Sequence, residues 1–161
     1  MLSNSKNIVL IGMPGSGKST IAKALAILTG RLMIDSDEEI LRRTGFSPKE
    51  LILTRGEPAF REIETEVIRD LGKREGIIIA TGGGVVTVRD NYELLHQNGC
   101  IIYLTRALEK LADKDRPISQ RCGVEKLFMQ REPLYKEFAD YVADNDENAE
   151  NVAGRILSMI S

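Results

Sequence analysis

Short apolar runs alternate along this chain with longer stretches whose apolar residues recur at helical spacing. Two of the runs, Asn7-Ile8-Val9-Leu10-Ile11 and Gly76-Ile77-Ile78-Ile79-Ala80, are dense in β-branched residues. The second run has no polar alternation, which is typical of a strand buried on both faces of a parallel sheet. The segments 31–35 and 100–104 are also short and apolar. We therefore predict strands at these four places.

Helices are predicted between these strands. The segment 58–73 is the clearest, because its apolar residues fall on one helical face. Its apolar positions are Phe60, Ile63, Val67, Ile68 and Leu71. Further helices are expected at 21–28, at 38–43, from residue 48 onward, at 89–97 and at the C-terminus. This alternation predicts an α/β fold with three α/β/α layers, in which a central, mostly parallel sheet of about five strands lies between helices.

The length and charge of the chain restrict what it can be. At 161 residues it is long enough for one domain with a core and too short for two ordinary ones, so we expect a single domain over residues 1–161. The net charge of −2 provides no overall field for nucleic acid or an acidic membrane. No apolar run approaches bilayer-spanning length, and the N-terminus lacks the apolar core of a signal peptide. We expect a cytoplasmic protein with no nucleic-acid or membrane partner.

The segment after the first predicted strand matches the phosphate-binding pattern G-x-x-x-x-G-K-[ST]. It precedes a predicted helix, which is the context that the motif requires. The glycines let backbone N–H groups converge on a polyphosphate at the helix N-terminus. Lys18 would reach the outer phosphates, and the Ser19 hydroxyl would ligate Mg²⁺. A plain glycine-rich turn needs neither residue, so we expect a nucleoside triphosphate here. The candidate nucleotide-binding residues are Gly12, Gly15, Ser16, Gly17, Lys18, Ser19 and Thr20.

Two more polar clusters follow predicted strands, so they should open onto the same edge of the sheet as the phosphate loop. Asp35 and Asp37 have a spacing that can turn both carboxylates to one side. One could hold a metal and the other could face a second substrate; alternatively, Asp37 caps the helix that begins at Glu38. Gly82-Gly83-Gly84 carries a large entropic cost on ordering, which favours close approach of a ligand to the backbone over a plain turn.

The remaining candidate binding residues are arginines. Arg61 lies among glutamates on a predicted helix, which by itself favours a surface ion pair with Glu57 or Glu64. Arg116 and Arg131 lie near prolines, in segments that lack the regular apolar spacing of a helix or a strand. An arginine held in a loop suits phosphate or carboxylate binding, because its guanidinium can bond two oxygens at once. Each of the two taken alone is nevertheless more typical of a surface residue.

Together these motifs resemble the shikimate kinases, small members of the nucleoside-monophosphate-kinase-like group of P-loop proteins. The resemblance extends from about residue 7 to the C-terminus. The motifs, found in this order along the chain, are far more specific for the family than the phosphate loop alone. It implies a P-loop kinase fold. The matching motifs are Gly12–Thr20, Asp35-Ser36-Asp37, Arg43-Thr44-Gly45, G-E-x-x-F-R-x-x-E at Gly56–Glu64, A-T-G-G-G-x-V at Ala80–Val86, Tyr103-Leu104, Arg116-Pro117 and R-x-P-L-Y at Arg131–Tyr135.

The resemblance implies phosphorylation of the 3-hydroxyl of shikimate by Mg²⁺-ATP, within aromatic amino-acid biosynthesis. It places Arg61 and Arg131 on the substrate carboxylate, and this replaces the surface interpretation of Arg61. Asp37 would bond the ring hydroxyls and act as a catalytic residue beside Lys18 and Arg116, and Arg116 would close over ATP. The backbone of Gly82, Gly83 and Gly84 would also hold shikimate. Ser19, with Asp35 through water, would form the Mg²⁺ site.

The segment around Arg116 departs from the family pattern. The family usually carries R-P-L-L where Arg116-Pro117-Ile118-Ser119 stands, so we expect a short lid over about 112–130. A gluconate-kinase-like enzyme is an alternative, although it would not be expected to repeat both Phe60-Arg61 and R-x-P-L-Y. A nucleotide-binding module with weakened catalysis is another, although retention of Lys18 and the two aspartates argues against it. We expect a monomer.

Overall fold

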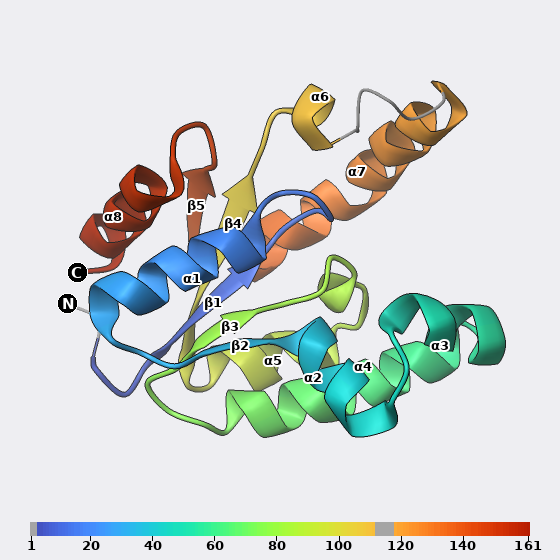
Figure 1. Ribbon diagram of the computed structural model, residues 1–161, viewed down its shortest axis with the longest axis horizontal. Coiled ribbons are helices and arrows are strands. Elements are labelled where there is room, and N and C mark those ends of the chain that lie inside the picture. The colour runs from blue at the N-terminus through green and yellow to red at the C-terminus, as the bar shows by residue number, and fades with distance from the viewer. Residues whose placement is uncertain (1–2, 112–117) are drawn as a thin grey trace.

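The computed structural model describes residues 3–111 and 118–161 and contains one parallel sheet between helices (Figure 1). The strand order is β2-β3-β1-β4-β5, and every neighbouring pair is parallel. This confirms the predicted α/β fold with its five-stranded sheet. The strands are β1 (Asn7–Ile11), β2 (Met33–Asp35), β3 (Ile78–Ala80), β4 (Gly99–Thr105) and β5 (Tyr141–Asp144).

The helices follow the predicted alternation, and the predicted helix 58–73 agrees with α4 to within one residue at each end. The described helices are α1 (Lys18–Thr29), α2 (Ser36–Thr44), α3 (Pro48–Arg55), α4 (Glu57–Gly72), α5 (Asp90–His96), α6 (Leu108–Leu111), α7 (Ile118–Phe138) and α8 (Ala149–Ile160), with a 3₁₀ turn η1 (Val85–Thr87). In the part of the chain that the structure describes, no helix combines the length and the apolar character needed to cross a membrane.

The helix α7 corrects one expectation. The sequence indicated a lid followed by irregular chain around Arg131, whereas residues 118–138 form one helix with Pro133 inside it. Proline removes one backbone hydrogen bond from a helix interior. Tyr135 and Phe138, which follow Pro133, are buried in the core, and this tertiary packing offsets the local cost.

Alternate side chains of β1 enter two hydrophobic cores. Val9 and Ile11 pack on the side that is covered by α4, α5 and α7. Ile8 and Leu10 pack on the side covered by α1 and α8, which lie next to each other in Figure 1. Because both faces of the sheet are covered, its carboxyl edge is where loops can meet a ligand.

Candidate active site

The loop between β1 and α1 is the centre of the site. Lys18 is the first residue of α1, and its Nζ donates to the carbonyl oxygens of Gly12 at 2.7 Å and Met13 at 2.9 Å. Burial lowers the pKa of Lys18 to about 8, although the negative charges of Asp37 and Asp35 act in the opposite direction. A phosphate bound in this loop would therefore gain a largely buried cation as its partner.

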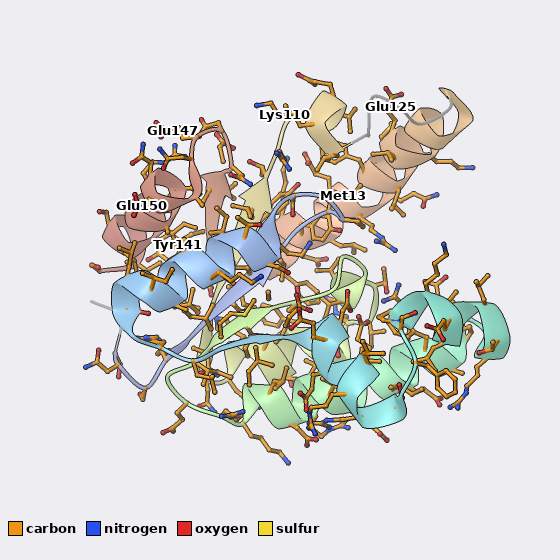
Figure 2. The ribbon with its side chains drawn as sticks, in the orientation of Figure 1. Met13, Lys110, Glu125, Tyr141, Glu147 and Glu150 are labelled. Atoms are coloured by element: carbon orange, nitrogen blue, oxygen red, sulfur yellow. The ribbon has the colours of Figure 1, made fainter. Side chains whose placement is uncertain are left out.

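Gly17 and Gly12 show why the loop needs glycine. The backbone of Gly17 has a φ of 93°, which L side chains rarely adopt, and a Cβ there would collide with the side-chain amide of Asn145. A Cβ on Gly12 would lie 2.5 Å from the carbonyl oxygen of Leu104. Met13 lies between them in sequence and is labelled in Figure 2; its side chain is buried in the core on the α7 side of the sheet.

Ser19 and Asp35 meet beside the loop. The Ser19 hydroxyl donates to Asp35 Oδ2 at 2.5 Å. The other carboxylate oxygen, Oδ1, accepts from the backbone N–H groups of Asp37 and Glu38 at 2.9 and 3.2 Å, so Asp35 is the N-cap of α2. The alternative in which Asp37 caps this helix is therefore wrong. A hydroxyl and a carboxylate oxygen side by side fit Mg²⁺, which takes one or two protein ligands together with substrate phosphates.

Asp37 lies in the first turn of α2 and faces the glycine loop that follows β3. A Cβ on Gly82 would stand 2.7 Å from Asp37 Oδ1. Burial raises the pKa of Asp37, and the charge of Asp35 adds to this effect, while Lys18 and Arg61 oppose it. The result is a partly desolvated acceptor between two cations, a suitable position for orienting a substrate hydroxyl.

Arg61 forms both of the ion pairs that the sequence suggested, but it does not lie on the surface. Its Nη1 donates to Glu64 at 2.8 Å and its Nη2 to Glu57 at 3.1 Å, and only 13% of its side chain is exposed. The guanidinium packs against Gly84, where a Cβ would come within 2.5 Å of its Cζ. This largely buried position beside Gly84 fits a binding role for Arg61 better than a surface ion pair.

Glu64 is a site residue that the sequence reasoning did not select. Its side chain is 1% exposed, and burial raises its pKa against the influence of Arg61. Glu64 Oε2 is buried without a hydrogen-bond partner among the described residues, and it lies 3.1 Å from the place of a Gly82 Cβ. Its spacing three residues after Arg61 was the signal that could have found it, since such residues share a helix face.

The three glycines use their backbone groups in different ways. The Gly82 N–H donates to the Ser36 hydroxyl at 3.1 Å, so this donor already has a partner within the protein. The Gly83 carbonyl accepts from the Tyr135 hydroxyl at 2.6 Å. Within the described residues, no hydrogen bond involves the N–H of Gly83 or Gly84, which makes these two the groups that a ligand could use.

Helix α7 brings Arg131 to the site. Arg131 is half-buried, and its positive charge acts on the pKa values of Lys18, Glu64 and Tyr135, which lie on three different elements. The predicted loop placement of Arg131 is wrong, because the residue lies inside a helix. Arg116 falls outside the described residues. The structure therefore brings Lys18 together with the predicted acceptor-side groups.

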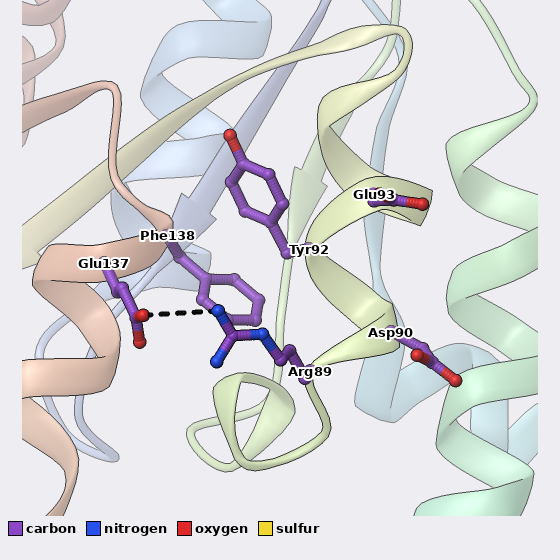
Figure 3. Close-up of a pocket in the computed structure, with 6 residues that line it drawn as sticks. All are labelled: Arg89, Asp90, Tyr92, Glu93, Glu137 and Phe138. Carbon is purple, nitrogen blue, oxygen red and sulfur yellow. Dashed lines mark ion pairs between the residues drawn. The ribbon is translucent and has the colours of Figure 1, made fainter.

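A separate pocket of about 470 Å³ lies between α5 and α7 (Figure 3). An ion pair from Arg89 Nη2 to Glu137 Oε1, 3.6 Å long, joins its two walls. None of the predicted site residues lines this pocket; its lining consists of Arg89, Asp90, Tyr92, Glu93, Glu137 and Phe138. It is therefore distinct from the candidate site.

Known proteins are similar to this chain in sequence and in fold. The family model "Shikimate kinase" matches residues 14–161. A shikimate kinase of Nitrosomonas europaea is 44% identical over 86% of this chain and 70% of its own length. One from Buchnera aphidicola is 39% identical and is covered almost completely, over 99% of this chain and 98% of its own.

Solved structures agree with the sequence matches. The shikimate kinase of Acinetobacter baumannii in complex with shikimate superposes with a TM-score of 0.90 at 37% identity, over 97% of this chain and 93% of its own. A sugar kinase from Janibacter, at 19% identity and a TM-score of 0.58 over 96% of this chain and 93% of its own, shares the fold alone. The match over nearly all of the sequence shows that the chain belongs to the shikimate kinase family.

Proposed function

We propose that this protein transfers the γ-phosphoryl group of ATP to the 3-hydroxyl of shikimate, giving shikimate 3-phosphate and ADP. The observation that carries the proposal is the convergence of opposite charges on the loop after β3. Asp37 lies against Gly82, and Arg61 lies against Gly84. A small molecule bound at this loop would meet a hydroxyl-binding group at one end and a carboxylate-binding group at the other.

The donor half of the site is formed by the phosphate loop. Lys18 would neutralise the outer phosphates, with the loop glycines supplying N–H donors. Ser19 and Asp35 would hold Mg²⁺, which supplies additional positive charge to the transferred group. Phosphoryl transfer requires alignment and charge neutralisation more than covalent assistance, so these roles account for most of the chemistry.

The acceptor half comes from α2, α4, α7 and the loop that follows β3. Arg61 and Arg131 would bind the shikimate carboxylate, and the Gly83 and Gly84 N–H groups would add neutral donors. Asp37 would accept a hydrogen bond from the 3-hydroxyl and hold it in line with the γ-phosphate. Its raised pKa leaves it able to take up the proton as transfer proceeds, although a loose transition state needs little base assistance. A single chain therefore supplies every group named here for the acceptor half.

A coupled ADP-release assay tests the proposal with shikimate, gluconate and nucleoside monophosphates as acceptors. Turnover confined to shikimate is expected, and Lys18→Met should abolish it. Turnover with gluconate would favour the gluconate-kinase-like alternative. Mg²⁺-ATP binding without turnover on any acceptor would favour the nucleotide-binding module.

A further inference from the structure

The loop that follows β5 contacts the phosphate loop through Asn145. The side-chain amide of Asn145 donates from Nδ2 to the carbonyl oxygen of Ser16 at 2.8 Å. The Asn145 backbone is itself held, because its N–H donates to the carbonyl of Thr105 at the end of β4 at 2.7 Å. A side chain from the loop after β5 therefore binds the middle of the phosphate loop.

The bond to Ser16 sets the direction of one donor. The carbonyl of one residue and the N–H of the next point to opposite sides of a planar trans peptide. Asn145 fixes the direction of the Ser16 carbonyl, so the Gly17 N–H of the same peptide points away from Asn145. A fixed orientation is what a phosphate-binding N–H needs.

The neighbouring peptide is held in a similar way. Arg106, directly after β4, donates from Nη1 to the carbonyl of Gly15 at 2.9 Å, and the Ser16 N–H donates to Met13 at 3.0 Å. Gly17 has no room for a side chain, because a Cβ would collide with Asn145 Nδ2. The loop geometry thus depends on groups that lie about 90 and 130 residues away in the sequence.

We propose that Asn145 is a positioning residue for the nucleotide: its side-chain amide fixes the Ser16–Gly17 peptide so that the Gly17 N–H binds a phosphate oxygen. The contact is made through another group, so Asn145 itself need not touch ATP. Arg106 is a less suitable residue for testing this, because removing its charge would also change the field at the phosphates.

The test is the Kd for Mg²⁺-ADP, measured by isothermal titration calorimetry on three variants of the full chain. Asn145→Ala and Asn145→Leu both remove the donor, and the leucine keeps a similar shape without adding charge. Each should raise the Kd about five- to tenfold, the effect of losing one oriented hydrogen bond. Asn148→Ala is the matched control, because Asn148 lies in the same loop and caps α8 through the Asn151 N–H. It should lower the melting temperature while leaving the Kd within about twofold.

Two results would overturn the proposal. If Asn145→Leu binds Mg²⁺-ADP as tightly as the unmodified protein, the shape of the side chain matters and its donor does not. If Asn148→Ala weakens binding as much as Asn145→Ala, the effect belongs to the loop as a whole.

Discussion

Tyr135 of α7 donates its hydroxyl hydrogen to the carbonyl of Gly83 at 2.6 Å. The Tyr135 ring is fully buried and stacks on Tyr103, with the ring centroids 5.0 Å apart. Burial raises the pKa of Tyr135 to about 12, so the hydroxyl remains a donor at neutral pH. The helix that carries Arg131 is thereby joined directly to the loop that we assign to shikimate. By the peptide geometry described above, this bond also orients the Gly84 N–H.

Tyr135→Phe should weaken shikimate binding and leave ATP binding unchanged. The substitution keeps the stacked ring and removes only the hydroxyl, so the Gly83 carbonyl loses its partner and the Gly84 N–H loses its fixed direction. We expect the Kd for shikimate to rise about fivefold, a typical value for one neutral hydrogen bond. Tyr103→Phe is the control, since the Tyr103 hydroxyl donates to Glu132 and does not contact the glycine loop. Equal effects of both substitutions on shikimate would contradict the assignment.

Arg61→Ala should reduce both stability and shikimate affinity, and a second substitution separates the two effects. Removing Arg61 leaves the buried Glu64 without its closest cation, which should cost about 3 kcal/mol of unfolding free energy. Adding Glu64→Gln removes the buried charge and should recover a large part of that loss in urea unfolding. The Kd for shikimate should remain raised in the double variant. Recovery of shikimate affinity there would mean that Arg61 serves only to neutralise Glu64.

Gly82→Ala should abolish most of the activity without unfolding the protein. The added methyl group would lie 2.7 Å from Asp37 Oδ1 and 3.1 Å from Glu64 Oε2, so one of these carboxylates must move. Displacement of a positioning group by about 1 Å can lower kcat/KM on the order of 100-fold. Gly154→Ala in α8 is the control, because a Cβ there meets nothing within 4 Å. It should leave kcat/KM unchanged and raise the melting temperature slightly.

Nucleotide binding should take up a proton above pH 8. The pKa of Lys18 in the free protein is about 8, below its usual value of 10.5. Binding of a phosphate restores the charged form, so ATP affinity should fall as pH rises beyond 8. The stability of the free protein should change with pH in the opposite direction. Between pH 8 and 10.5 the unfolded chain holds a proton that the folded protein has lost. The free energy of unfolding therefore rises with pH in this range, because the cost of burying charged Lys18 is relieved.

Calorimetric titrations with ATP at pH 8.5, in buffers of different ionisation enthalpy, measure this proton directly. Lys18→Arg should show no such uptake, because an arginine stays charged throughout this range. The same uptake in Lys18→Arg would assign the proton to another group.

The local sequence carried enough information for the fold and for the residues in strand-end loops. The strands at 7–11 and 76–80 were recognisable from their β-branched composition, and a parallel sheet necessarily brings the loops after them to one edge. That is why the phosphate loop, Asp35, Asp37 and Gly82–Gly84 could be placed together without coordinates.

The remaining features depend on contacts between distant segments. Pro133 argued against a helix at Arg131, and only the packing of Tyr135 and Phe138 shows why α7 continues through it. Asn145 lies in an acidic loop with no motif of its own, and its bond to Ser16 spans 129 residues. No pattern of nearby residues contains that information.

The strand order places most of the groups assigned to each substrate on separate parts of the sheet. With β1 in the centre, the acceptor groups Asp37, Arg61 and Gly82–Gly84 come after β2 or β3 on one side, while Arg106 and Asn145 follow β4 and β5 on the other. Arg131 is the exception, because α7 lies between β4 and β5 in the chain. Changes after β2 and β3 can therefore alter most of the acceptor contacts while the groups after β4 and β5 that hold the phosphate loop stay in place. In evolutionary terms, new acceptors are accessible to this architecture through changes at β2, β3 and α4, with the ATP-handling half inherited intact.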